Sequence, residues 1–130
     1  MTALRLARYP HHRGTTRSAI VDDLLEMAAQ GGIDAVRASI EMLTDLHQNG
    51  LQCRFLKKMH GVLWELKTRA RGGEKGGTRV YLFWLNADQV VILHAEVKTG
   101  DSPSAEMLNT CARFYTAFRC GKDIFEEETL

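Results

Sequence analysis

With 130 residues, 45% of them apolar and 25% charged, the chain has the size and composition of one globular domain. No apolar run approaches the ~20 residues that a membrane-spanning helix needs, and Arg5, Arg8 and Arg13 are followed by no apolar segment, which argues against a secretory signal. We therefore expect a cytoplasmic protein with a single domain over residues 1–130, including a basic N-terminal arm (1–15) and an acidic tail (121–130).

The cysteines and the charges limit the kinds of site that the chain can carry. Cys53, Cys111 and Cys120 are widely separated and no pair has the spacing of metal ligands, so we predict free thiols and no metal site. The net charge is only +1, yet residues 54–79 contain eight basic and two acidic residues. This stretch is either the footprint of a polyanion or a solvated surface, and charge alone does not choose between them.

The first half of the chain predicts a strand and two helices. Residues 3–8 partly alternate between apolar and polar side chains, as a short strand does. Helical spacing of apolar residues begins after Ser18, a candidate N-cap, and stops at the glycines at positions 31 and 32. A second helix is predicted from about Asp34 to Gly50, and the short link between the two predicts an antiparallel helical hairpin.

The second half predicts an antiparallel meander followed by a helix. Alternating stretches at residues 62–69, 79–85 and 90–98 predict three strands joined by a glycine-rich loop and a short turn. Ser102 as N-cap and Pro103 at the first helical position predict the last helix, after which the tail is expected to fray. The chain therefore predicts an α+β fold: a short first strand, a helical hairpin, an antiparallel β-meander and a C-terminal helix.

The alternation also predicts which side chains share a face of the sheet. In the first strand of the meander, Trp64 faces the core and Lys67 faces away from it. In the third strand, Ala95 is expected to face opposite to His94 and Lys98. The basic residues expected to converge on one face are Lys67, Arg69, Arg79, His94 and Lys98.

Two of these basic residues have an alternative interpretation. Arg79 can pair with Glu65 across the hairpin, which would make it structural. His94 lies in an otherwise apolar strand, where a half-buried, hydrogen-bonded histidine is common.

Three segments, LKKMHGVLWELKTR, TRVYLFWL and VVILHAEVKTGDSP, carry a family resemblance over about residues 54–118. In that order they resemble the RelE/ParE toxin superfamily, most closely its phage-derived, HigB-like branch. The first resembles a lysine-rich turn before Gly and a Leu-aromatic-Glu-Leu-basic strand. The second resembles an Arg-Val strand rich in aromatics, and the third an apolar strand ending in Leu-His before a polar link to a helix. The chain differs at Glu96, where the branch usually has an aromatic residue, and in a longer loop around ARGGEKGGT.

The resemblance implies the toxin of a type II toxin–antitoxin system, a ribosome-dependent mRNA endoribonuclease whose partner is a helix-turn-helix antitoxin. RNA cleavage requires deprotonation of the 2′-OH, stabilisation of charge on the phosphate and protonation of the 5′-oxygen. Lysine, arginine and histidine side chains can do this without a cofactor. The residues expected to be catalytic are the five listed above, and those expected to bind RNA are Lys57, Lys58, His60 and Arg71.

Two other functions fit the same fold. A ParE-like gyrase inhibitor would rely on the helical hairpin and the tail rather than on the cationic face. A non-catalytic phage or prophage protein would keep the fold and bind nucleic acid or a protein partner, and the change at Glu96 favours this alternative.

Overall fold

The computed structural model describes residues 1–8, 18–59, 61–68, 77–98, 103–121 and 125–127. The elements in chain order are β1 (Ala3–Ala7), α1 (Ala19–Ala29), α2 (Ile33–Asn49), β2 (Leu56–Lys58), β3 (Trp64–Lys67), β4 (Thr78–Asn86), β5 (Gln89–Val97), α3 (Ala105–Arg119) and β6 (Phe125–Glu127). A short 3-10 turn, Gly50–Gln52, links α2 to the strands that follow. None of the described helices is long and apolar enough to cross a membrane.

The strands form one mixed sheet in the order β2-β3-β4-β5-β1-β6. The predicted meander is confirmed, since β3, β4 and β5 pair antiparallel in chain order. The first strand, β1, pairs with β5 in parallel. After β1, the helical hairpin carries the chain across the sheet, and β2, β3 and β4 follow before β5. The predicted α+β fold is therefore confirmed, with β2 and β6 as the two edges.

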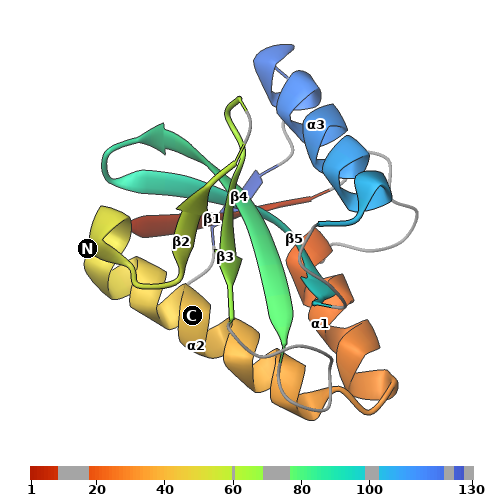
Figure 1. The fold of residues 1–130 in the computed structure, drawn as a ribbon. Coiled ribbons are helices and arrows are strands. Elements are labelled where there is room, and N and C mark those ends of the chain that lie inside the picture. The colour runs from red at the N-terminus through yellow and green to blue at the C-terminus, as the bar shows by residue number, and fades with distance from the viewer. Residues whose placement is uncertain (9–17, 60, 69–76, 99–102, 122–124, 128–130) are drawn as a thin grey trace.

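Both faces of the sheet are covered, as the ribbon in Figure 1 shows. On one face, Leu66, Val80 and Ile92 pack with Ile20 of α1 and Leu46 of α2. We call this the hairpin face. On the opposite face, the α3 face, the buried strand residues Tyr81, Phe83, Val91 and Leu93 pack with Cys111 and Phe114 of α3. The sheet is thus apolar on both sides. The expected division into an apolar face and a cationic face holds only near one end of β3.

A β-bulge in β5 changes which of its residues share a face. Val80 pairs with Ala95 but Leu82 pairs with Ile92, so Leu93 and His94 together lie opposite Tyr81. The strict alternation predicted for residues 90–98 is therefore wrong beyond Leu93. The extra residue places Ala95 on the hairpin face, whereas the same alternation had grouped it with Leu93.

The observed ends of α2, α3 and the C-terminal tail can be compared with the predicted ones. The second helix ends at Gly50 as predicted, where φ is 56°. The last helix is capped by Ser104, whose Oγ accepts from the Met107 N–H at 3.1 Å, rather than by Ser102, which lies outside the described residues. The tail was expected to fray, but Phe125–Glu127 pairs antiparallel with β1, so sheet hydrogen bonds hold this part of it.

Candidate functional site

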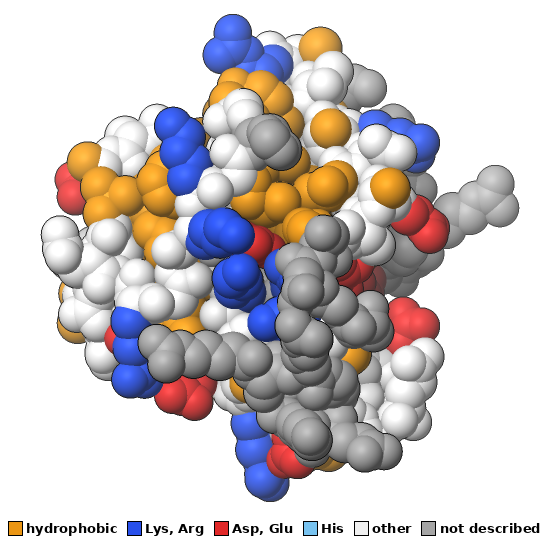
Figure 2. Space-filling view, viewed as in Figure 1, with side chains coloured by type: hydrophobic (Ala, Val, Ile, Leu, Met, Phe, Trp, Pro, Cys, Tyr) orange, Lys and Arg blue, Asp and Glu red, His pale blue; other side chains and the backbone are white. Residues whose placement is uncertain are grey.

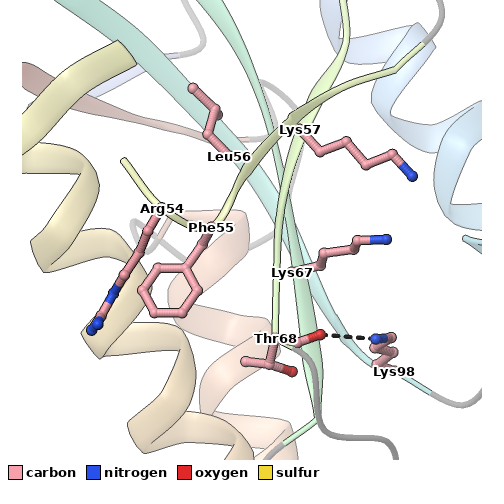
Figure 3. Close-up of a pocket in the computed structure, with 7 residues that line it drawn as sticks. All are labelled: Arg54, Phe55, Leu56, Lys57, Lys67, Thr68 and Lys98. Atoms are coloured by element: carbon pink, nitrogen blue, oxygen red, sulfur yellow. Dashed lines mark hydrogen bonds between the residues drawn. The ribbon is translucent and has the colours of Figure 1, made fainter. Parts of the chain in front are cut away.

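Three lysines from three strands line one surface pocket. Lys57 comes from β2, Lys67 from the end of β3, and Lys98 directly follows β5. The pocket has a volume of about 500 Å³ and is also lined by Arg54, Phe55, Leu56 and Thr68. In Figure 3 the three lysine side chains extend to the same side of β3. We call Lys57, Lys67 and Lys98 the lysine cluster.

Strand register explains how residues so far apart in sequence meet. Lys57 pairs with Glu65, and Glu65 and Lys67 share a face of β3 because they are two residues apart. Lys98 reaches the same place because the bulge shifts the end of β5 by one residue. Its backbone N–H donates to the Gly77 carbonyl at 3.0 Å, and its Nζ donates to the Thr68 carbonyl at 2.8 Å.

The described wall of the pocket is positively charged, and the Glu65 carboxylate acts on Lys67 from outside this wall. The charged residues that line the pocket in the described part of the chain are all basic. Contact with the Lys57 ammonium lowers the pKa of Lys67, as do partial burial and the charge of Lys98, while Glu65 acts in the opposite direction. A bound anion reduces the repulsion between like charges that lie this close together. The pocket therefore has the chemistry of a phosphate-binding site.

The cluster lies on a broader surface that mixes cationic and apolar groups. Figure 2 shows Lys and Arg side chains gathered near the middle of this face, beside an exposed apolar area. Partly buried Met59, Leu63 and Leu85 pack at the rim of the α3-face core, together with Tyr115 and Phe118 of α3. A surface of this composition can contact both the phosphates and the bases of a single strand.

Arg79 does not join the lysine cluster at the surface. Its side chain is 1% exposed, and Nη1 donates to Glu65 Oε2 at 2.9 Å. This is the alternative arrangement expected from the sequence, in which Arg79 of β4 pairs with Glu65 of β3 across the β-hairpin. The pair lies beneath Lys67, since Lys67 and Arg79 are register partners.

His94 is likewise held inside the protein. Its Nδ1 lies 2.6 Å from Asp23 Oδ2 of α1, and the same oxygen accepts from the Ala95 N–H at 3.0 Å. The imidazole also contacts the Phe114 ring of α3, with centroids 5.5 Å apart. His94 therefore joins both helical layers to β5 and does not line the pocket.

The remaining predicted site residues divide into two groups. Lys58 is exposed but pairs with Trp64, so by alternation it points to the side opposite Lys57. Lys58 therefore does not line the pocket with Lys57, because neighbouring strand residues face opposite ways. His60, Arg69 and Arg71 lie outside the described residues.

Glu96, the position that differs from the family pattern, anchors α3 to the sheet. Its Oε1 accepts from the Tyr81 hydroxyl at 2.7 Å and from the Ser104 N–H at 3.1 Å, and its Oε2 accepts from Ser104 Oγ at 2.8 Å. Burial, together with this hydrogen bond, raises the pKa of Tyr81, so the phenol stays protonated. The carboxylate thus sits at the N-terminus of α3, where the helix dipole favours negative charge.

Arg54 lines the pocket but was not among the sequence-predicted site residues. Its Nη2 donates to Glu41 Oε1 at 3.1 Å, and its backbone N–H donates to Asp45 Oδ2 at 3.1 Å. Asn49 Nδ2 in turn donates to Asp45 Oδ1 at 2.8 Å. The sequence feature that could have indicated a role for Arg54 is the four-residue spacing of Glu41, Asp45 and Asn49. This spacing aligns the three side chains on one side of α2.

A comparison with protein families identifies the family of this chain. The family profile described as "Phage derived protein Gp49-like (DUF891)" matches residues 16–116. The match includes the helical hairpin, the meander and most of α3. A search of curated proteins gives no significant match.

Proposed function

Because the chain belongs to the phage-derived Gp49-like family, part of the RelE/HigB-like toxin group, we propose that it is the toxin of a type II toxin–antitoxin pair. Its activity is cleavage of mRNA on the ribosome, and its partner is a helix-turn-helix antitoxin. The observation that carries this proposal is the convergence of Lys57, Lys67 and Lys98 on one pocket that no described acidic residue lines.

The lysine cluster supplies the chemistry that cleavage needs. Lys57 and Lys98 donate charged hydrogen bonds to the scissile phosphate, where negative charge develops in the transition state. Lys67 has the lowered pKa, so it exchanges a proton more readily than an ordinary lysine. It takes the proton from the 2′-OH, and that oxygen attacks phosphorus to form a 2′,3′-cyclic phosphate. The bond from phosphorus to the 5′-oxygen breaks, and the Lys57 ammonium gives a proton to this leaving oxygen.

Arg79 and His94 act as positioning residues in this proposal. The Glu65–Arg79 pair fixes β3 against β4 directly beneath Lys67. The contact between His94 and Asp23 fixes the bulge from which β5 continues to Lys98. Neither side chain needs to touch RNA, and removing either one displaces a lysine.

Expression in bacteria with a matched control tests the proposal. The double variant Lys57→Gln/Lys67→Gln should abolish growth arrest and remove the new 5′ ends that mapping of cellular transcripts detects. Lys58→Gln removes the same charge from the adjacent, opposite-facing position and should leave both effects intact. A double variant as toxic as the wild type would contradict the mechanism.

A second experiment addresses the ribosome and the partner. Purified protein with ribosomes and a defined mRNA should yield fragments, and mRNA without ribosomes should remain intact. Co-expression of the neighbouring gene should restore growth. Cleavage of free mRNA at the same rate would contradict the ribosome requirement, and growth arrest despite the neighbouring gene would contradict that choice of antitoxin.

One observation favours a second candidate, a non-catalytic nucleic-acid-binding protein of the same family. Arg79 and His94, two of the five residues expected to be catalytic, are engaged in internal contacts. The lysine cluster would then bind RNA without cleaving it. In that case, expression would produce no new 5′ ends, while the purified protein would still bind RNA through Lys57 and Lys67.

A further inference from the structure

The pocket has a second wall whose chemistry differs from that of the lysine cluster. Arg54 and Phe55 lie on the other side of β3 from the lysine side chains in Figure 3, and both line the same pocket. The centre of the Arg54 guanidinium lies 4.8 Å from the centroid of the Phe55 ring. The strand β2, which follows Arg54 and Phe55 in the chain, lies at one edge of the sheet.

Arg54 is exposed and yet held in one orientation. Its side chain is 68% exposed, while Glu41 holds the guanidinium, Asp45 holds the backbone N–H and Phe55 supports the guanidinium plane. The Cys53 thiol donates to Asp45 and, with the Arg54 N–H and Asn49, lowers the pKa of that carboxyl, so the support stays charged. An exposed ion pair adds little stability by itself. Contacts from two α2 residues, Glu41 and Asp45, therefore orient Arg54 more than they stabilise the fold.

We infer that Arg54, supported by Phe55, is a stacking platform for a nucleobase of single-stranded RNA whose phosphate lies on the lysine cluster. Guanidinium planes stack on bases, and a base on an oriented arginine binds in a sequence-tolerant way because every base has a flat face. The RNA strand passes around the β2 edge, with phosphate on the α3 side and base on the α2 side. This inference rests on the proposed function, since it uses the same phosphate site.

The two walls make separable contributions to binding. The lysine cluster recognises only the backbone, so it binds an abasic strand as well as a normal one. The Arg54 platform recognises only the base. The part of the preference for a strand with bases over an abasic strand that is lost when Arg54 is replaced therefore measures the platform.

Fluorescence anisotropy with two uncleavable probes tests this separation. The probes are a 2′-O-methyl hexa-adenylate and an abasic 2′-O-methyl strand of the same length. Wild-type protein should bind the adenylate about tenfold more tightly, as expected for one stacked base. Arg54→Lys keeps the charge but removes the plane, so the preference should fall to about twofold or less, with binding of the abasic strand unchanged.

Controls keep this outcome distinct from a failure of the proposed function. Arg37→Lys makes the same replacement at an exposed arginine of α2 and should keep the full preference. Lys57→Gln/Lys67→Gln should weaken binding of both probes equally. If that double variant bound both probes like the wild type, the phosphate site would be wrong. If the lysine variant behaved as expected while Arg54→Lys kept the preference, or if the wild type showed none, the platform alone would be wrong.

Discussion

Two groups of basic residues at the same end of the sheet have opposite environments. The lysine cluster lines a surface pocket without a described acidic neighbour in its wall, whereas Arg79 and His94 are buried, each against a carboxylate. The lysines come from β2, β3 and the residue after β5, whereas Arg79 comes from β4 and His94 from β5. All five were predicted to serve one site. The difference indicates that Lys57 and Lys67 are available for a ligand, while Arg79 and His94 maintain the structure that presents them. Lys98 is intermediate, because it lines the pocket but is only 7% exposed and donates to the Thr68 carbonyl.

The largest expected effect comes from removing one member of the buried pair. Arg79→Met leaves Glu65 charged and buried without its partner, which should lower the free energy of unfolding by about 3–5 kcal/mol. Urea denaturation followed by circular dichroism measures this. Arg113→Met, at an exposed position of α3, should change stability by less than about 0.5 kcal/mol. If Arg79→Met lowered the free energy of unfolding as little as Arg113→Met does, Arg79 would be accessible to a ligand and not a buried partner of Glu65.

A smaller loss is expected at the histidine contact. Asp23→Ala leaves the His94 ring nitrogen and the Ala95 N–H without their shared acceptor, which should cost about 2 kcal/mol in the same denaturation experiment. Glu26→Ala on the same helix removes an exposed carboxylate and should cost far less. Equal effects of the two variants would show that Asp23 does not fix β5.

The lysine cluster should respond in the opposite way, with a change in binding and little change in stability. Lys57→Gln/Lys67→Gln should weaken binding of single-stranded RNA about tenfold. It should also reduce the slope of log affinity against log salt concentration by about 1.4, as expected for two lost phosphate contacts. Anisotropy titrations over a salt series measure both. An unchanged slope would mean that these lysines do not contact phosphate.

The smallest effect is a change in the titration of Lys67. Contact with the Lys57 ammonium is the main reason that the pKa of Lys67 is lowered, so Lys57→Gln should raise it toward its ordinary value. Lys67 would then lose its proton at a higher pH than in the wild type, and chemical shifts of its labelled Cε would follow this. A pKa that stays constant or falls would show that the two ammonium groups are not close in solution.

The sequence predicted the sheet well because most strands keep a strict alternation. Trp64 and Leu66 lie on one side of β3, with Glu65 and Lys67 on the other, as the period of two requires. The bulge was not predictable, since Leu93, Ala95 and Val97 are all apolar and remain consistent with a strand in either register. An extra residue at this point changes which side Lys98 reaches without changing the hydrophobic pattern.

The candidate site was only partly predictable, because burial depends on register and packing. The pairing of Glu65 with Arg79 across the β-hairpin was one of two expected arrangements, but nothing in the local pattern reveals that the pair is buried in the core. Arg54 was missed for a related reason, since its orientation depends on α2 packing beside the start of β2. Lys67 was predicted because it lies on a strand whose alternation the sequence shows correctly. Lys57 and Lys98 were predicted from the family resemblance and the basic character of their segments, although β2 was not predicted as a strand and β5 contains the bulge.

The short edge strand that carries Lys57 has a consequence for self-association. An exposed sheet edge offers unpaired backbone groups to another copy of the chain, and short strands bearing lysines discourage such pairing. β2 has three residues, Leu56–Lys58, with lysines at two adjacent positions that face opposite ways. The positive charge that attracts a polyanion therefore also repels a second copy of the same edge, so neutralising these lysines would favour oligomers at high protein concentration.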